Sequence, residues 1–306
     1  MIARAAFAAV LLLASAAAAQ EGDLLTGTLL RIRDRGVIRI GVRDAAVPFA
    51  FRNRGGQPIG FSVDICHGIA EDVAEALNRD LLEPDAPAWQ SGIRIAYVPV
   101  AADERLGMVQ AHAIDLECGS TTATEERAKS VAFSPTFFIA GTKLAVPAGS
   151  PVSSWRDLAG KTVAVSAGTT NEAVLQRLAG TIAPPLLVRS MPSVDAAFDA
   201  AASGRAGAVA SDDILLAGMI ASHPAAARFR IVGDYLSFEP YAIMLAKDDP
   251  PFLALVRASF TRQAEAGSLR ALYQRWFTEP LPTGGNMALP MSAQLSELFR
   301  ALGQPD

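Results

Sequence analysis

The sequence predicts an α/β protein made of two lobes that are joined by two crossing segments. Apolar, β-branched runs alternate with helical patterns along the chain, which is typical of largely parallel sheets with helices on both faces. A chain of 306 residues is long for one hydrophobic core and suits two. Extended apolar runs at 137–146 and 241–246 bracket the second set of elements, so the chain leaves the first lobe and later returns to it.

The first lobe begins after residue 19. Its expected strands are 37–42, 93–98 and 113–118, and its expected helices are 61–77, 105–110 and 124–129. In the second lobe we expect strands at 162–166, 186–190 and 207–210, and helices at 171–178, 194–202 and 214–220. C-terminal helices over 253–277, an irregular stretch at 280–290 and a last helix at 292–302 complete the chain. Lobe 1 is therefore assigned to 20–139 and 240–306, and lobe 2 to 140–239, with crossings near 138–142 and 238–241.

The N-terminus has the pattern of a secretory signal peptide. Arg4 precedes a short apolar run, 5–14, and small residues follow at 15–19. We expect cleavage before Gln20 and a mature protein in the periplasm. A membrane anchor and a disordered tail are the alternatives, but the apolar run is too short to span a bilayer comfortably.

The composition argues against several classes of function. The net charge is −4, and basic residues form no block, so nucleic-acid binding has no electrostatic footprint. The three histidines do not have metal-ligand spacing, and no serine lies in a G-x-S-x-G turn. We therefore expect no metal, no cofactor and no catalytic residue.

The two cysteines, Cys66 and Cys118, allow one pairing. Export would place them in an oxidising compartment, which favours a disulfide. Two buried free thiols are the alternative, because free cysteines behave as small hydrophobic residues.

Ligands of open α/β sheets bind at the carboxyl ends of the strands, so the polar residues there are the candidates. Segment 119–127 ends a strand and opens a helix, where free backbone N–H groups, Ser120, Thr122 and Arg127 form a potential carboxylate site. The alternative is an ordinary helix cap with a solvated arginine.

Lobe 2 and the arginines supply the remaining candidates. Thr170 belongs to segment 166–170, which could hold an anion or simply cap a helix. Asp212 could pair with an ammonium group or serve as a helix N-cap. Arg43 and Arg105 each follow a predicted strand, and two guanidinium groups beside one cleft would favour a dianionic ligand. For either arginine alone, a surface charge is the alternative.

From about residue 27 to residue 302, the chain resembles the periplasmic amino-acid-binding proteins of ABC transporters, family 3 of the bacterial solute-binding proteins. The likeness is greatest to the glutamate/aspartate-binding branch. It rests chiefly on the runs GVIRIGVR at 36–43, VPF at 47–49, GFSVD at 60–64, ECGSTT at 117–122, SAGTT at 166–170 and SGRA at 203–206, with Glu126-Arg127 and Asp212-Asp213.

The resemblance implies a type II periplasmic binding-protein fold, with two hinge strands and a ligand cleft between the lobes. It implies that Arg127, Ser120 and Thr122 clamp the ligand α-carboxylate with help from Thr170, and that Asp212 pairs with the α-ammonium group. It also implies that Arg43 and Arg105 hold a side-chain carboxylate. This chain has Ala102 and Val194 where the acidic-ligand branch carries a serine and a histidine.

The resulting hypothesis is a periplasmic binding protein that captures an L-amino acid, glutamate or aspartate first, and delivers it to an ABC permease in the inner membrane. We expect it to act as a monomer and not as an enzyme. Broad amino-acid binding, a small-carboxylate dehydratase on the same scaffold and a ligand sensor for a membrane receptor are the alternatives.

Overall fold

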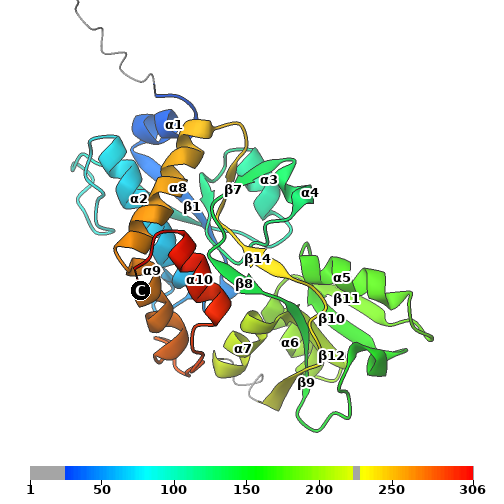
Figure 1. Cartoon of the computed structure of the whole chain (residues 1–306). Helices are drawn as coiled ribbons and strands as arrows, with labels where there is room; N and C mark the ends of the chain where they lie inside the picture. The colour runs from blue at the N-terminus through cyan, green and yellow to red at the C-terminus, as the bar shows by residue number, and fades with distance from the viewer. Residues whose placement is uncertain (1–24, 223–227, 306) are drawn as a thin grey trace, which may run out of the picture.

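The computed structural model describes residues 25–222 and 228–305. The expected signal peptide lies outside these residues. Two five-stranded sheets form the centres of two lobes, and a narrow waist connects them (Figure 1).

The sheet of lobe 1 has its parallel strands on one side and its antiparallel strand near the other edge. Strand β1 (Val37–Val42) pairs in parallel with β5 (Arg94–Pro99) and β6 (Leu116–Glu117). Strand β15 (Met244–Ala246) runs antiparallel between β6 and β7 (Val131–Phe133). The helices of this lobe are α1 (Gly27–Arg35), α2 (Phe61–Ala76), α3 (Arg105–Gln110), α4 (Glu125–Ala128), α8 (Pro250–Glu265), α9 (Ser268–Tyr273) and α10 (Ala293–Ala301).

Lobe 2 repeats this arrangement. Strand β10 (Thr162–Ser166) pairs in parallel with β11 (Leu187–Met191) and β12 (Ala208–Asp212). Strand β9 (Thr142–Pro147) runs antiparallel between β12 and β13 (Phe229–Val232). Its helices are α5 (Thr170–Ala179), α6 (Val194–Ala202) and α7 (Asp213–Ser222), with a 3₁₀ turn at Trp155–Leu158.

Two short strands form the waist. Strands β8 (Phe138–Ala140) and β14 (Glu239–Tyr241) pair antiparallel, with Glu239 opposite Ala140 and Tyr241 opposite Phe138. One residue beyond β8, the chain enters β9 of lobe 2, and two residues beyond β14 it enters β15 of lobe 1. The predicted pair of crossing strands is therefore present. The residue limits of the lobes stay a prediction.

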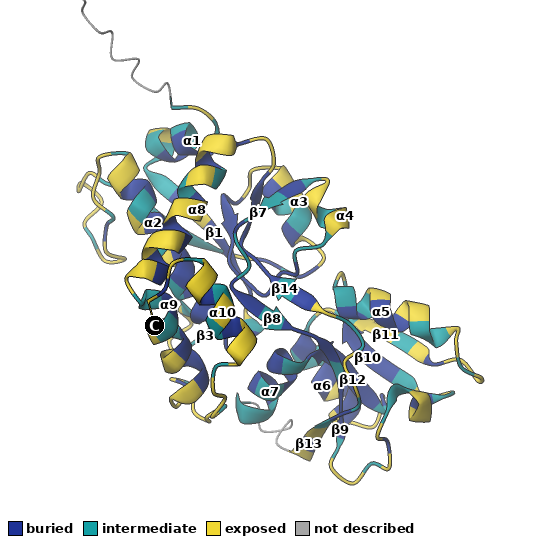
Figure 2. Ribbon diagram, in the orientation of Figure 1, coloured by how far each residue is buried: buried dark blue, intermediate teal, exposed yellow. Residues whose placement is uncertain are grey.

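Apolar periodicity explains the main packing. On α2, Phe61, Ile65, Ile69 and Val73 fall on one face, and all four are fully buried in the core of lobe 1 (Figure 2). The last helix, α10, belongs to the same core, because Leu295 and Phe299 are buried in it.

Helix α7 of lobe 2 also reaches the core of lobe 1. Its residues Ile214 and Leu215 are buried in the same cluster as Val47 and Phe138. Contact between the lobes therefore includes an apolar component beside the polar cleft.

The predicted disulfide is confirmed. Cys66 and Cys118 are bonded, with their Cα atoms 6.4 Å apart, within the usual range for a disulfide. The bond ties the second turn of α2 to the residue that follows β6. It therefore anchors the start of segment 119–127.

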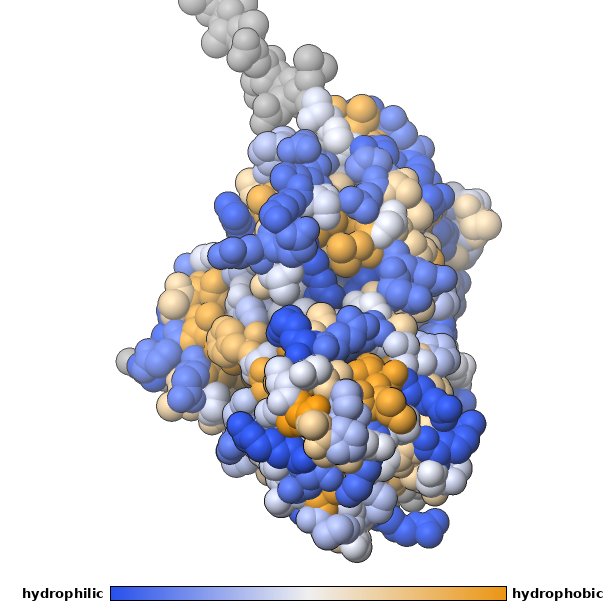
Figure 3. Space-filling view, turned by 90° about the vertical axis from the view of Figure 1, so that its right-hand side faces the viewer, coloured by the Kyte–Doolittle hydropathy of each residue, from blue (hydrophilic) through white to orange (hydrophobic). Residues whose placement is uncertain are grey.

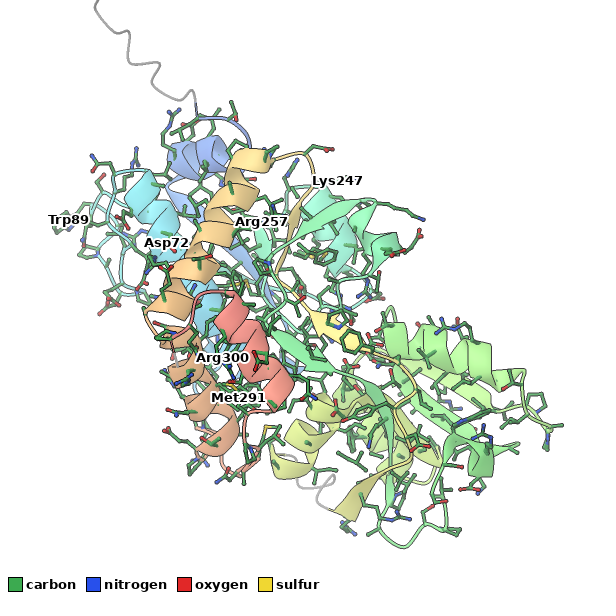
Figure 4. The ribbon with its side chains drawn as sticks, viewed as in Figure 1. Asp72, Trp89, Lys247, Arg257, Met291 and Arg300 are labelled. Carbon is green, nitrogen blue, oxygen red and sulfur yellow. A yellow bond between two sulfur atoms is a disulfide. The ribbon has the colours of Figure 1, made fainter. Side chains whose placement is uncertain are left out.

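The outer surface is mostly polar. Hydrophilic residues cover much of the face shown in Figure 3 and separate its apolar patches. Trp89, labelled at the outer edge of lobe 1 in Figure 4, is 84% exposed. Among the described residues, no helix has both the length and the apolar character that a membrane crossing requires.

Two parts of lobe 1 differ from the prediction. The strand expected at 113–118 is reduced to β6, because residues 111–113 turn back toward α3 and Ala113 N–H donates to the carbonyl oxygen of Met108. The small sheet of β2 (Ala45–Ala46), β3 (Ala50–Arg52) and β4 (Pro58–Ile59) was not predicted, and neither was α1.

Candidate ligand-binding site

A small cavity lies between the lobes, where the parallel strands of both sheets end. Its volume is about 20 Å³, which is room for about one water molecule. Both lobes contribute to its wall, which consists of Arg43, Ala46, Arg105, Ser120, Thr122, Ser166, Thr169, Thr170, Asn171, Val194, Ser211, Asp212 and Leu215.

Six of the seven predicted site residues line this cavity. From lobe 1, Arg43 follows β1, Arg105 begins α3, and Ser120 and Thr122 follow β6. From lobe 2 come Thr170, which begins α5, and Asp212, which ends β12. Asp212 ends β12 directly before α7, and its side chain accepts hydrogen bonds from Asn171 and Tyr241. The predicted roles of these residues stay a prediction.

Arg127, the seventh, does not line the cavity. Its guanidinium donates to the carbonyl oxygen of Thr122 at 2.9 Å and, across the cleft, to that of Gly168 at 3.3 Å. Burial and the nearby charge of Arg105 lower the pKa of Arg127 to about 10, so it remains cationic at neutral pH. A guanidinium has five N–H groups, and these two bonds leave three of them for another partner.

Arg43 and Arg105 form a positive pair on the lobe 1 side of the cavity. Arg43 is 9% exposed and makes no hydrogen bond or ion pair with any described residue. Burial lowers its pKa to about 10, and the charge of Arg105 acts in the same direction. Arg105 is 2% exposed; one nitrogen donates to the Thr121 hydroxyl at 2.6 Å, and its Nε is buried without a partner.

Behind this pair lies a carboxylate that sequence reasoning did not assign to the site. Glu117 is fully buried, and its Oε2 accepts a hydrogen bond from the Thr121 hydroxyl at 2.5 Å. Its Oε1 is buried without a hydrogen bond. Its charge raises the pKa of Arg43 and opposes the effect of burial. Glu117 therefore neutralises part of the positive charge of the arginine pair.

The lobe 2 side of the cavity carries a buried carboxylate. Asp212 is 4% exposed and accepts hydrogen bonds from Asn171 at 2.8 Å and from the Tyr241 hydroxyl at 2.5 Å. Burial, with a further contribution from Glu239, raises the pKa of Asp212 to about 7. A cation beside Asp212 would offset both effects.

Glu239, on the crossing strand β14, is 2% exposed, and its charge acts on Asp212. Its Oε2 accepts hydrogen bonds from the hydroxyls of Thr122, at 2.6 Å, and Thr170, at 2.5 Å. One carboxylate thus joins lobe 1, lobe 2 and the waist.

Sequence reasoning missed Glu117, Glu239 and Asn171. Asn171 directly follows the segment 166–170, and Glu117 lies two residues before the segment 119–127, so a wider search around these segments would have included both. Glu239 has no comparable signal, because it is a single acid next to an apolar run.

Helix capping and site formation are combined in both loops. Thr124 accepts the Arg127 N–H at 3.2 Å, and Thr169 accepts the Glu172 N–H at 3.2 Å. Thr169 also lines the cavity. Both segments therefore cap a helix, as the alternative interpretation expected. Capping does not prevent the same segments from contributing to a ligand site.

Of the two departures from the acidic-ligand pattern, Val194 lines the cavity, whereas Ala102 is buried outside its wall. Residues 25–222 and 228–305 contain no cluster of histidine, cysteine and acidic side chains that could hold a metal ion.

The comparison with protein families agrees with this architecture. Residues 38–279 match the model of the bacterial extracellular solute-binding proteins, family 3. The chain belongs to this family. The type II periplasmic binding-protein fold that the resemblance implied is confirmed by solved structures of similar chains. An ancestral arginine-binding protein bound to arginine has a TM-score of 0.68 at 28% identity, over 79% of this chain and 99% of that one.

Two curated relatives cover most of the chain. The L-glutamate/L-aspartate-binding protein of Pseudomonas aeruginosa is 35% identical over 90% of this chain and 89% of its own. The glutamate/aspartate import solute-binding protein of Salmonella typhimurium is 34% identical over 94% of this chain and 92% of its own.

Proposed function

We propose that this protein is a periplasmic receptor that captures an acidic L-amino acid, glutamate or aspartate, and delivers it to an ABC importer in the inner membrane. Binding and release are its function, without a catalytic step. The family and the names of the two relatives support the proposal. The observation that carries it is the charge pattern of the cavity wall, which has a pair of buried arginines on the lobe 1 side and a buried aspartate on the lobe 2 side.

This pattern matches a ligand with charges of both signs. We assign the α-ammonium group to Asp212, where its positive charge would stabilise the ionised carboxylate. We assign the α-carboxylate to Ser120 and Arg127, beside Thr122 and, from the facing lobe, Thr170. The side-chain carboxylate then lies at Arg43 and Arg105. Two guanidinium groups in a dry site repel each other, and an anion between them removes that repulsion.

The charge of Glu117 determines how many negative charges the ligand side chain should carry. Arg43 and Arg105 contribute two positive charges, and Glu117 contributes one negative charge. The remaining single positive charge is matched by one side-chain carboxylate of glutamate or aspartate. A neutral glutamine side chain would leave it uncompensated, which is unfavourable in a buried site.

Binding requires the lobes to move. A cavity of about 20 Å³ is too small for an amino acid, so the lobes must open to admit one. The ligand would then bridge the lobes and stabilise the closed state, which the permease recognises.

Calorimetry with glutamate, aspartate and glutamine at physiological salt tests the specificity. We expect glutamate or aspartate to bind at least about tenfold more tightly than glutamine, a difference of about 1.4 kcal/mol. Arg43→Ala and Arg105→Ala should weaken glutamate binding more than glutamine binding. Arg79→Ala, which removes an exposed arginine far from the cavity, is the control.

Two results would contradict the acidic assignment. One is equal affinity for glutamine and glutamate, which would support broad amino-acid binding. The other is that neither arginine substitution changes the preference. If no amino acid raises the melting temperature of the wild-type protein, the proposed function itself is wrong.

Cellular fractionation tests the proposed location. The mature protein should be recovered in the periplasmic fraction, with Gln20 as its first residue by N-terminal sequencing. Recovery of the full-length chain in the membrane fraction would contradict a cleaved signal peptide.

A further inference from the structure

The Glu239 carboxylate accepts hydrogen bonds from three side-chain hydroxyl groups. Besides Thr122 and Thr170 on Oε2, the Ser237 hydroxyl donates to its Oε1. The residue does not itself line the cavity, but both threonines do. Its contact with the ligand site therefore passes through two hydroxyl groups, one from each lobe.

The direction of these hydrogen bonds follows from the number of protons. A carboxylate can only accept, and a threonine hydroxyl has a single proton. When Thr122 and Thr170 both donate to Glu239, neither hydroxyl has a proton left for a ligand. Each can then present only lone pairs to the cavity.

The hydrogen bonds of the neighbouring residues also lead to buried carboxylates. The Asn171 amide donates one N–H to Asp212 at 2.8 Å and the other to the Thr142 hydroxyl at 2.7 Å. Thr142 can in turn donate to the Ser237 hydroxyl at 2.7 Å, and Ser237 donates to Glu239. These hydrogen bonds thus end on two buried carboxylates, Asp212 and Glu239.

The part of the cavity wall formed by Asp212, Thr122 and Thr170 thus offers acceptors and negative charge. An ammonium group has three N–H donors and no acceptor, so it fits Asp212 and the two threonine hydroxyls. A ligand carboxylate would face lone pairs on those hydroxyls, so it must use other donors, such as backbone N–H groups or Arg127.

We infer that Glu239 is a positioning residue for the ligand ammonium group: it turns the hydroxyls of Thr122 and Thr170 into acceptors and adds a second negative charge behind them. This inference rests on the proposed amino-acid ligand. It replaces the expectation that the two threonine hydroxyls donate to the α-carboxylate. The effect of Glu239 on the pKa of Asp212 agrees with the closeness of the two carboxylates.

Two ligands separate this role from a purely structural one. Glutamate carries the ammonium group, and glutarate is the same dicarboxylate without it. The variants are Glu239→Gln, which keeps an acceptor oxygen but loses the charge, and Glu239→Met, which loses both. Glu83→Gln removes an exposed carboxylate in lobe 1 and is the charge-matched control.

Calorimetry and competition binding should show a loss confined to the ammonium ligand. We expect Glu239→Met to weaken glutamate at least roughly tenfold, Glu239→Gln to lie between it and the wild type, and glutarate affinity to change less than about threefold. Equal losses for both ligands would mean that Glu239 only holds the lobes together and would overturn the inference.

If glutarate binds too weakly to measure, the same question can be tested in a double variant that lacks both threonine hydroxyls. In Thr122→Val/Thr170→Val, the hydroxyls through which Glu239 acts are gone. The loss of glutamate affinity caused by Glu239→Met should then fall to less than half of its wild-type value, as measured by a thermodynamic cycle. An undiminished loss would also overturn the inference. Wild-type protein that binds no amino acid would instead refute the proposed function.

Discussion

Gly218 of α7 lies directly against the backbone of Val47 in the other lobe. A Cβ atom at Gly218 would lie 2.2 Å from the Val47 carbonyl oxygen, far inside any normal contact. The same kind of contact occurs between Gly168 and Asp103, where a Cβ atom would be 2.5 Å from the Asp103 Cα atom. The lobes therefore meet through glycines on lobe 2, where side chains would keep them apart.

Gly218→Ala is expected to weaken ligand binding without unfolding the protein. The added methyl group blocks full closure, whereas the open form relieves the clash, so glutamate affinity should fall at least about tenfold. Gly107→Ala is the matched control, because that helical glycine has open space around its Cβ position. Calorimetry and thermal melting of both variants test this. Unchanged affinity in Gly218→Ala would show that binding does not need this contact.

Affinity for glutamate is expected to fall as the pH drops below 7. Asp212, whose pKa is raised to about 7, must be ionised to pair with an ammonium group. Binding therefore releases a proton below pH 7, and affinity rises with pH until Asp212 is ionised in the free protein. Burial is the largest cause of this raised pKa; the charges of Glu239 and Asp213 add to it, and the hydrogen bonds from Tyr241 and Asn171 oppose it.

Calorimetry from pH 5 to pH 8 measures this dependence. The wild type should lose up to about tenfold in affinity per pH unit below 7, and Asp212→Asn should bind weakly with a nearly flat profile. A flat wild-type profile would mean that Asp212 is already ionised before the ligand arrives.

Glu117→Gln is expected to sharpen the preference for acidic ligands. Loss of this buried charge leaves Arg43 and Arg105 uncompensated, so the ratio of glutamate to glutamine affinity should rise by about tenfold. The folded protein should also lose stability, because Glu117 accepts from Thr121 beside both guanidinium groups. Titrations with the two amino acids and a urea melt measure both effects. A reduced ratio would show that Glu117 is not the counter-ion of the pair.

Arg127→Ala is expected to weaken all amino-acid ligands alike. The α-carboxylate is common to all of them, and leaving it unpaired in the closed cleft should cost about 3 kcal/mol. Arg127→Lys should recover little, because an ammonium group cannot bridge two acceptors as a planar guanidinium does. A loss for glutamate alone would place Arg127 at the ligand side chain and contradict its assignment.

Loss of the disulfide is expected to lower the free energy of unfolding by about 2–4 kcal/mol. Cys66 and Cys118 are 52 residues apart in sequence, so their bond restricts a long loop in the unfolded chain. Urea denaturation of Cys66→Ala/Cys118→Ala against the wild type measures this. Glutamate affinity should fall as well, because Cys118 directly precedes Gly119 and Ser120. Unaltered unfolding and binding would show that packing alone holds this segment.

The fold was largely predictable because local pattern and tertiary packing agree along most of the chain. Strands β1 and β10 and helices α3 and α6 occupy the predicted residues. The two-residue strands β2 and β4 are too short to show a period of two, so the sequence contains no signal for them. Only Leu116 and Glu117 of the predicted 113–118 strand are paired, because the preceding turn is fixed by contacts with α3.

The site was predictable where its residues follow strands. Arg43, Ser120, Thr122 and Asp212 all lie at the carboxyl ends of sheet strands, where parallel topology gathers them. Glu239 could not be found in this way. Its role depends on Thr122 and Thr170, which are 117 and 69 residues distant in sequence and meet it only when both lobes are in place.

The pairing of β8 with β14 makes lobe 2 a removable module. Ala140 and Glu239 belong to the two strands that connect the lobes, and they are direct partners in one antiparallel ladder. A lobe whose two connections lie side by side can be exchanged between related proteins if the geometry of that one strand pair is kept. Evolution, or an engineer, can then recombine the half of the site that carries Asp212 with a different half that carries the arginines.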